Sequence, residues 1–522
     1  MVTNLEFLKT GGLYPPTTEV ARLARYQRYD DLFKGKLASS YESFIRDRTQ
    51  SGVIQNSMKT IFTNPRIMNY PRAITKKTVD LMVSRTPSLL STTEAKDNAL
   101  LEIARETRLW KKVRLGMTDV CRYGNAYIRQ YNKVPRYLDD NGGLTEGKAA
   151  CNIINPKMVT HIVNPLDKED IQAYVVGWVD EVHTPYFSNG VPMEKSEYYL
   201  TVEIHYEGEY EYRRFKCATP IVNAGRVKQW VLEEEVTPAD MKGVKYKTGL
   251  KGFAIIPLIG YTTSDNPNEG LSEYDMFDSL VIDLCERVSQ LSEVFEKHGD
   301  PSMQGSENLL SNDEDGNPIF YAGDFYPLGK DDHPLSYITW DAKSKEIIEY
   351  CNQILQQIFM LADMGDGSIM GFTQTGNSGF AESGKAIRMR MASPLMKVQA
   401  LITDNNDEII NMIVNFSDIM GKGLKASDIE IKWQDGLPID WVEETNMFNA
   451  RVTSGTESIK YGLQRRFGMT PQQADDELEQ IIKEKEMVAR STQQQPVEAD
   501  TRETTEKKAD AENAGTSDIT PQ

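Results

Sequence analysis

Two amphipathic segments, residues 271–297 and 343–361, carry apolar residues at alternating spacings of three and four. In an α-helix this spacing places the apolar side chains on one face, which then needs a partner helix. A polar stretch rich in Gly, Pro and Asp separates the segments, so we predict a two-helix stalk with a small structure at its end. The alternative is two ordinary core helices that flank a surface insertion. The stripe residues are Phe277, Val281, Leu284, Val288, Leu291 and Phe295 in the first segment and Ile347, Cys351, Ile354, Ile358 and Leu361 in the second.

Before the stalk, the pattern changes from helical to strand-like. Residues 19–33, 70–82 and 94–120 have apolar positions at helical spacing. Alternating apolar and polar positions then predict strands bounded by Gly, Pro or Asn. The predicted strands are 125–131, 153–162, 174–182, 198–206, 210–215 and 228–232, and a short apolar run at 252–261 is interrupted by Pro257. The pattern therefore predicts an α+β fold with a β-rich region between two helical parts.

Between and after the stalk helices, the sequence predicts a small hairpin, a loop and more helices. In the excursion, residues 309–310 can face 318–321 across the turn 313–317. The Gly-rich residues 363–379 predict a loop, and a long helix should follow from about 381 to 420. Proline lacks a backbone donor, so we expect a kink at Pro394.

The C-terminal part should begin with a strand at 429–433, followed by two helices. Ser454 with Glu457 and Thr470 with Gln473 have the spacing of capping boxes, and Pro471 suits a first helical position. Residues beyond 490 are polar and contain no aromatic side chain, so we expect a disordered tail.

Composition narrows the class of protein. The 522 residues carry a net charge of -18, which argues against a protein that grips nucleic-acid phosphates over a wide surface. The five cysteines are scattered without a CxxC pair, as in reduced core positions, so neither disulfides nor zinc is expected. No N-terminal apolar segment and no run of eighteen apolar residues occurs, and we expect assembly in a cytoplasm without membrane spanning.

Three motifs suggest chemistry that their surroundings do not support. Residues 379–385 have P-loop spacing, but Ala386 stands where a magnesium-binding hydroxyl belongs, and no buried strand precedes the loop. The acidic residues 312–317 have Ser311 and Ala322 at the end positions of a calcium loop, where carboxylates are needed. The five histidines form no HExxH pair. We therefore expect no enzyme activity, cofactor or metal site.

The order of these elements resembles the portal proteins of tailed bacteriophages. Ala24-Arg-Tyr-Gln-Arg-Tyr-Asp-Asp-Leu-Phe-Lys-Gly35 is similar to the segment before the family's wing, and Tyr123-Gly-Asn-Ala-Tyr127 to its wing strand. Ile256-Pro257-Leu-Ile followed by Ser272-Glu-Tyr-Asp275 resembles the start of its stem. Ser383-Gly-Lys-Ala-Ile387 with Pro394-Leu395 resembles the start of its long wing helix. The resemblance covers residues 20 to 490 and rests on the order of short motifs.

This resemblance implies a portal fold with a β-rich and helical wing, a two-helix stem, a small α/β clip, a long kinked wing helix and a helical crown. The implied segments are 1–265 N-terminal helices and wing, 266–299 stem helix, 300–340 clip, 341–362 stem helix, 363–380 tunnel loop, 381–435 wing helix and strand, 436–490 crown and 491–522 tail.

The resemblance also implies a function. About twelve subunits would form a ring at a unique capsid vertex of the virion, through which double-stranded DNA is packaged and ejected. The implied partners are terminase, a head-tail adaptor, the major capsid protein and the scaffolding protein. About twelve helices spaced roughly 10 Å apart enclose a lumen about 28 Å wide, enough for a duplex of about 20 Å.

Charge along the chain fits passage of DNA better than binding. Residues 346–384 contain neither Lys nor Arg, so this stretch cannot form ion pairs with phosphates. The first stalk segment holds Asp275, Asp278, Asp283, Glu286, Glu293 and Glu296 off its stripe. They form either an ordinary solvated face or a face that repels DNA in a lumen. In the loop, we expect the side chains of Met364, Ile369, Met370, Phe372, Thr373 and Gln374 to face DNA.

Two other functions stay open at this stage. An ATP-driven nucleic-acid motor would use the P-loop-like residues 379–385, and a scaffold or adaptor oligomer would have no DNA channel. Nucleotide binding would distinguish the motor, and the presence of a central hole in images of the oligomer would distinguish the scaffold.

Overall fold

The computed structural model of the protein describes most of the chain in ten stretches and several short pieces. The stretches are 5–36, 66–91, 93–134, 147–188, 191–222, 226–299, 344–364, 391–434, 441–467, 471–493 and the pairs and single residues between 303 and 337, with positions 436 and 469 besides. The chain divides into two compact units, Met1–Asp440 and Trp441–Gln522. Among the described helices, none is long and apolar enough to cross a membrane.

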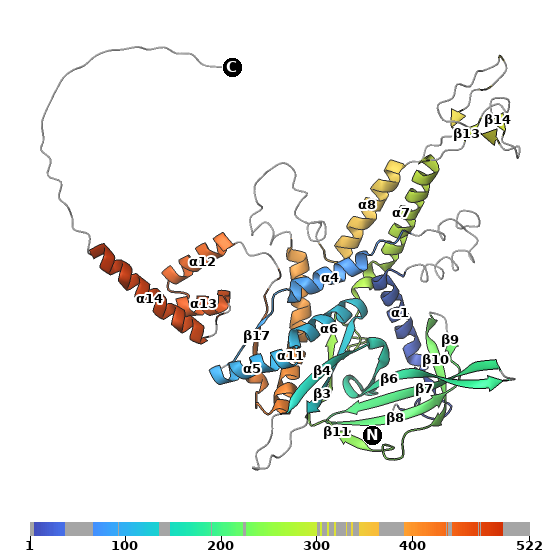
Figure 1. Cartoon of the computed structure of the whole chain (residues 1–522), viewed down its shortest axis with the longest axis horizontal. Coiled ribbons are helices and arrows are strands. Elements are labelled where there is room, and N and C mark those ends of the chain that lie inside the picture. Colours follow the sequence, from blue (N-terminus) through green and yellow to red (C-terminus); the bar gives the residue numbers. More distant parts are fainter. Residues whose placement is uncertain are drawn as a thin grey trace. The chain divides into compact units, whose positions relative to one another are not determined.

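The structure describes four α-helices before the β-rich region (Figure 1). They are α1 (Val20–Lys34), α4 (Tyr70–Val83), α5 (Glu94–Glu106) and α6 (Leu109–Tyr123). The helical pattern predicted over 94–120 is confirmed, but it is divided into two helices, because the backbone turns between α5 and α6. Arg108 has a left-handed backbone with φ 53°, and the Thr107 hydroxyl donates to the Ile103 carbonyl at 2.7 Å at the end of α5.

The β-rich region forms an eight-stranded and a three-stranded sheet. The larger sheet has the order β1-β10-β8-β7-β6-β5, with β9 beside β10 and β11 beside β8. Its strands are β1 (Leu13–Tyr14), β5 (Val159–Asn164), β6 (Asp167–Ser188), β7 (Val191–Tyr206), β8 (Glu209–Cys217), β9 (Ile221–Val222), β10 (Lys228–Glu235) and β11 (Lys245–Lys247). The predicted strands at 174–182, 198–206, 210–215 and 228–232 lie within longer ones.

The smaller sheet has the order β12-β3-β4 and corrects one predicted strand. It contains β3 (Asn125–Val134), β4 (Lys148–Ile154) and β12 (Ile255–Ile259). The strand predicted at 153–162 is divided between the two sheets, because Pro156 starts a short 3-10 turn that Asn155 caps. Pro257 lies opposite Tyr127 in β12, an edge strand, where a missing N–H is tolerated.

A long helix, α11 (Ala392–Met420), packs against α4, α5 and the three-stranded sheet. Its residues Ile409, Met412, Ile413 and Phe416 are at most 1% exposed and belong to the largest apolar core. The described helix begins at Ala392, so Pro394 lies in its first turn, where backbone donors lack intrahelical partners. A kink at Pro394 would need helical residues before Ala392, and 365–390 lie outside the described residues.

Beyond α11, Gly421 takes a left-handed conformation with φ 74° at the helix end. The predicted strand at 429–433 is confirmed as β17 (Glu430–Lys432), which pairs with β2 (Ser88–Leu90).

The two predicted stalk helices are present as α7 (Asp278–Gly299) and α8 (Ser344–Leu361). They lie side by side and extend away from the sheets (Figure 1). The first begins later than the predicted residue 271, because Glu273–Met276 form a 3-10 turn, capped by Ser272, that ends at Phe277.

At the far end of the stalk, the described residues form two short antiparallel pairs (Figure 1). They are β13 (Met303–Gln304) with β16 (Ser336–Tyr337), and β14 (Ser311–Asn312) with β15 (Pro318–Ile319). The predicted hairpin is thus confirmed in its second strand, whereas its first strand is Ser311–Asn312 instead of 309–310. The turn 313–317 lies outside the described residues.

The second unit contains α12 (Trp441–Thr453), α13 (Ile459–Phe467) and α14 (Pro471–Gln493), one described helix more than expected. The start predicted at Ser454 is wrong, because Gly455 with φ 72° follows the end of α12. Ser458 caps α13 instead, and its hydroxyl accepts from the Tyr461 amide at 3.1 Å. Pro471 is the first residue of α14, as predicted. The predicted disordered tail begins at residue 491, but α14 continues to Gln493. Residues 494–522 lie outside the described residues.

Candidate functional site

The base of the stalk is a closed apolar core. Five stripe residues, Phe277, Val281, Leu284, Ile354 and Ile358, are each at most 3% exposed. They share a cluster with side chains of α1 and α4, namely Tyr26, Tyr29, Leu32 and Ile74. The chain therefore anchors its own stalk through the lower half of the stripe, without the help of a second copy.

Toward the far end of the stalk, the side chains of the same stripe are more exposed. Val288 and Cys351 are partly buried against the cluster, Leu291 and Ile347 are half-buried, and Phe295 is 56% exposed. Leu361, at the base end of α8, is also partly buried against the cluster. A phenylalanine left in water forfeits roughly 2 kcal/mol of burial free energy. The upper stripe thus needs an apolar partner that this chain does not supply among its described residues.

Between residues 353 and 360 the outer face of α8 is uncharged. Gln353, Gln356, Gln357 and Met360 lie at i, i+3, i+4 and i+7, and each is exposed. Met360 is 70% exposed. Carboxamides hydrogen-bond to water and to polar surfaces but carry no charge that attracts phosphates.

The acidic residues of the first stalk segment are less available than the sequence suggested. Arg28 pairs with Asp278 at 2.7 Å, and burial raises the pKa of Asp278. Asp283 pairs with Arg287 at 3.3 Å and accepts from the Tyr350 hydroxyl at 3.0 Å. The Tyr29 hydroxyl donates to Asp275.

Glu286 is only 6% exposed. Of these four acids Asp275 alone is exposed, so they do not form a continuous solvated or lumen face. The side chains of Glu293 and Glu296 lie outside the described residues.

Among the predicted DNA-facing residues, the structure describes Met364 alone. This side chain is 2% exposed and packs in the stalk-base cluster. The prediction of an apolar loop tip is therefore wrong for Met364, because the first loop residues fold back onto α8, where the Met364 amide donates to the Phe359 carbonyl at 2.8 Å. Ile369, Met370, Phe372, Thr373 and Gln374 lie outside the described residues.

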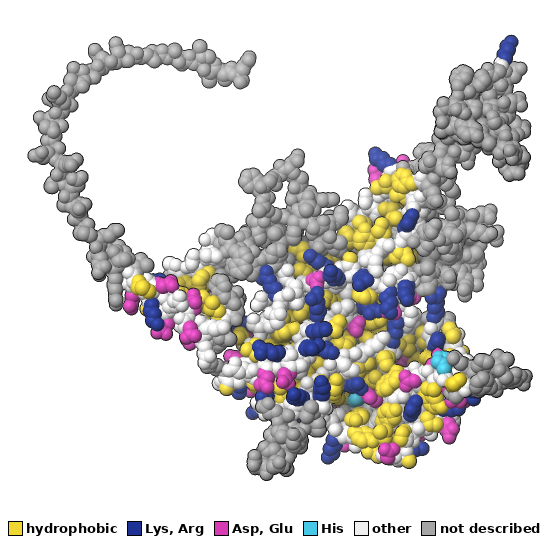
Figure 2. Space-filling view, in the orientation of Figure 1, with side chains coloured by type: hydrophobic (Ala, Val, Ile, Leu, Met, Phe, Trp, Pro, Cys, Tyr) yellow, Lys and Arg dark blue, Asp and Glu magenta, His cyan; other side chains and the backbone are white. Residues whose placement is uncertain are grey.

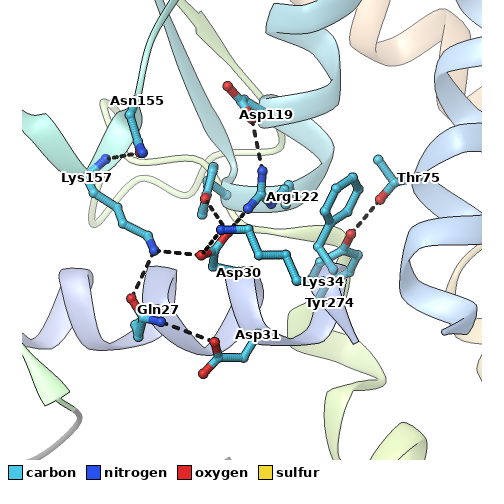
Figure 3. A network of polar contacts seen from close by, with 12 residues as sticks. Gln27, Asp30, Asp31, Lys34, Thr75, Asp119, Arg122, Asn155, Lys157 and Tyr274 are labelled. Carbon is cyan, nitrogen blue, oxygen red and sulfur yellow. Dashed lines mark hydrogen bonds and ion pairs between the residues drawn. The ribbon is translucent and has the colours of Figure 1, made fainter. Parts of the chain in front are cut away.

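A buried charge network joins α1 to the end of α6 beside the stalk base (Figure 3). Asp30 of α1 contacts Arg122, accepts from Lys34 at 2.8 Å and lies 3.2 Å from Lys157. Arg122 also stacks over the ring of Phe33, 4.4 Å from its centre. Burial lowers the pKa of Arg122, and burial together with neighbouring cations lowers the pKa of Lys157 to about 8. The network holds α1 against α6 through one carboxylate shared by three cations.

A second buried pair ties α11 to the stalk. Lys397 Nζ lies 3.0 Å from Glu273 Oε1, and their side chains are 17% and 7% exposed. The contact is an ion pair without hydrogen-bond geometry, since neither Glu273 oxygen has a hydrogen-bond partner. Lys397 donates instead to the Ala362 carbonyl at 2.9 Å, at the end of α8. One lysine therefore links the long helix, the start of the stalk and the end of α8.

Sequence reasoning missed these two charge clusters. Asp30, Glu273 and Lys397 lie in segments predicted as helices and Arg122 lies just after one, where charged residues are usually solvated. The available signal was their place on the apolar side of those helices, where a charge needs a buried partner.

Asp119 provides a test of the network through pH. Burial raises the pKa of this carboxyl from 3.8 to about 7, even though Arg122 lies 3.6 Å away. Above pH 4 the unfolded chain releases this proton while the folded chain retains it, so folded-state stability falls as the pH rises toward 7. Asp119→Asn removes this cost and should stabilise the protein by on the order of 2–4 kcal/mol at pH 8 and little at pH 4.

Thermal unfolding at both pH values measures this difference. Asp240→Asn, at an exposed position, is the matched control and should shift neither melting temperature. An equal shift for Asp119→Asn at pH 4 and pH 8 would contradict the assignment.

The comparisons with known proteins agree with this architecture. The family described as "Phage portal protein, SPP1 Gp6-like" matches residues 17–491. The chain belongs to this family. The predicted family and the α+β fold class are thereby confirmed. No curated protein matches this portal protein.

Solved structures similar to this portal protein come from gene transfer agent (GTA) particles. One is the virion of a native GTA particle, with 11% identity and a TM-score of 0.39, covering 80% of this chain and 95% of that chain. Another is the neck of an empty particle, with 11% identity and a TM-score of 0.42 at the same coverage. A third is the neck of a native particle computed with C12 symmetry, with 12% identity and a TM-score of 0.39, covering 77% of this chain and 91% of that chain.

Within the described part of the portal protein, no group of three or more His, Cys, Asp or Glu side chains is placed to hold a metal ion. The five cysteines are free, and four of them are buried.

Proposed function

We propose that this portal protein forms a ring of about twelve subunits at a unique capsid vertex, through which double-stranded DNA is packaged and later ejected. The observation that carries the proposal is the stalk, which is anchored in its own chain at the base and uncovered along the upper stripe. Packing of Phe295 and Leu291 against a neighbouring stalk would complete the core, and repetition of that contact around an axis closes a ring.

The parts of the chain then take the family's roles. Residues 266–299 and 341–362 are the stem, 300–340 the clip, 363–380 the tunnel loop, 1–265 with 381–435 the wing, and 436–490 the crown. The clip would dock terminase during packaging and a head-tail adaptor afterwards, while the wing meets the major capsid and scaffolding proteins. The ring would be assembled in the host cytoplasm and kept in the virion.

The channel would let DNA slide because it offers phosphates no cation. Residues 346–384 have neither Lys nor Arg, and Gln353, Gln356 and Gln357 give α8 an uncharged outer face. Lys and Arg side chains that neutralise phosphates release counterions condensed on the duplex, and this release supplies the electrostatic affinity. A lumen without cations therefore has little electrostatic affinity for DNA.

Added cations on α8 test this proposal. Gln353→Lys with Gln357→Lys would place about two dozen positive charges around a ring of about twelve subunits, and DNA should then be retained in a salt-dependent way. Rings should still form, since both side chains are exposed. Packaging of full-length DNA is expected to stall at low ionic strength and to recover partly as salt is raised.

The matched control is Gln353→Glu with Gln357→Glu, which changes the same positions but cannot hold phosphates. Packaging should proceed with this variant. Images of the purified protein should first show that it forms rings. A solid particle or a monomer in place of a ring with a central hole would contradict the proposed channel. Unchanged packaging by the lysine variant at every salt concentration would show that α8 does not face the DNA.

A further inference from the structure

The helices α4 and α6 carry an excess of positive charge on a chain that is acidic overall. Together they hold seven Lys and Arg residues and two acidic residues, Asp80 and Asp119. Figure 2 shows Lys and Arg side chains gathered over α4 and α6 on the face in view. The net charge of -18 makes this local reversal of sign informative, because composition alone does not produce it.

The contacts between the helices place these cations along one line. Arg72 at the start of α4 and Arg122 near the end of α6 both stack on Phe33, with 5.7 Å and 4.4 Å from guanidinium carbon to ring centre. Asp80, near the end of α4, pairs with Arg114 in the middle of α6. The two helices are therefore antiparallel neighbours, and Lys76 lies between these two contacts.

Past Arg114 the line continues through Lys111 to Arg108. We call the set Arg72, Lys76, Lys77, Arg108, Lys111 and Arg114 the basic row. Arg72, Lys76, Arg108 and Lys111 are exposed, and Lys77 is half-buried. The fifteen residues of α6 extend over about 22 Å at 1.5 Å per residue.

Most of the row has no counter-ion. Arg114 pairs with Asp80 and Arg72 stacks on Phe33, but the side chains of Lys76, Lys77, Arg108 and Lys111 form no ion pair with a described residue. A row of unpaired, exposed cations attracts an extended anion. A protein partner would be expected to meet exposed aromatic or aliphatic anchors as well, and Leu115 is the single large apolar side chain exposed on α4 or α6.

We propose that the basic row binds the phosphates of double-stranded DNA without reading its sequence. This inference rests on the proposed passage of DNA through the ring and adds a place where the protein holds DNA, apart from the uncharged stalk. Because a duplex presents one charge per about 1.7 Å of its axis, a row of this length faces many phosphates. The DNA contact is electrostatic and therefore weakens steeply with salt.

Salt-dependent binding of a labelled 30-base-pair duplex to the full chain tests the row. Lys76→Gln, Lys77→Gln and Lys111→Gln together should weaken binding about 100-fold or more at low salt and lower the slope of log affinity against log salt by about 2.5 to 3. The charge-conserving variant with arginine at the same three positions should bind as the wild type does. Lys245→Gln, Lys247→Gln and Lys251→Gln, at exposed positions outside the row, should leave the slope unchanged.

Three results would overturn the proposal. The first is that the wild-type chain binds no duplex at low salt, and the second is that the glutamine variant binds like the wild type. The third is that polyglutamate binds the row more tightly than the duplex does, which would indicate an acidic protein partner. Ring formation by the same glutamine variant, seen in images, separates this inference from the proposed function. Rings with unaltered DNA binding contradict the row alone, whereas absence of rings from the wild-type chain contradicts the channel.

Discussion

Leu284→Asp is expected to unfold the stalk base and to abolish ring assembly. Leu284 is 3% exposed and lies in the cluster that joins α7 and α8 to α1 and α4. The substitution removes a buried leucine, worth about 2 kcal/mol or more, and places a carboxylate where it has no partner, at a cost of several kcal/mol besides. The variant should run as monomer or aggregate in size-exclusion chromatography and should melt about 4 °C lower, the effect of about 4 kcal/mol in a chain of this size.

Phe295→Asp is the matched comparison, because it makes the same kind of change at the uncovered end of the stripe. Phe295 is 56% exposed, so the monomer should fold and melt as the wild type does. If neighbouring stalks pack at this end, the carboxylate should nevertheless prevent ring formation. Normal rings from both variants would show that the stripe is not an assembly surface, and normal melting of Leu284→Asp would contradict its place in the core.

Lys397→Met is expected to destabilise the folded protein by about 3–5 kcal/mol. It leaves Glu273, 7% exposed, as a buried carboxylate without a counter-ion, which costs about 3–5 kcal/mol. It also removes the hydrogen bond to the Ala362 carbonyl. Burial disfavours the ammonium ion, yet Glu273 outweighs it and raises the pKa of Lys397. The pair therefore contributes stability below pH 10.5, the ordinary value, and loses it as the pH rises above that.

Glu273→Gln combined with Lys397→Met should recover most of the lost stability, because it removes the orphaned charge. Lys9→Met breaks an exposed Lys–Glu pair whose side chains are 67% and 81% exposed, and it should change stability by less than about 1 kcal/mol. Thermal unfolding of the wild type, Lys397→Met, the double variant and Lys9→Met measures these differences. A similar loss of stability for Lys397→Met and Lys9→Met would contradict the buried ion pair between α11 and the stalk.

The sequence by itself determined the order of elements and the class of fold. Periodicity is a local property, so the spacing of Val281, Leu284 and Ile354 was enough to predict α7 and α8 and their apolar faces. Turn residues such as Pro471 also marked a helix start where the structure has one. Where the predicted bounds differ from the structure, the backbone conformation at one site interrupts a continuous pattern. At Arg108 this is a left-handed φ, and at Pro156 it is a capped 3-10 turn.

Tertiary structure alone decided which polar residues are buried and which charges meet. Asp30, Arg122, Glu273 and Lys397 are separated widely in the chain, and no local pattern predicts that they lie together. The same reason explains Met364, which the sequence placed at an exposed loop and the structure buries against Phe359. It also explains the basic row, since the packing of α4 against α6 gathers cations that the net charge of -18 conceals. Electrostatic attraction and desolvation act through space, whereas the hydrophobic period acts along the chain.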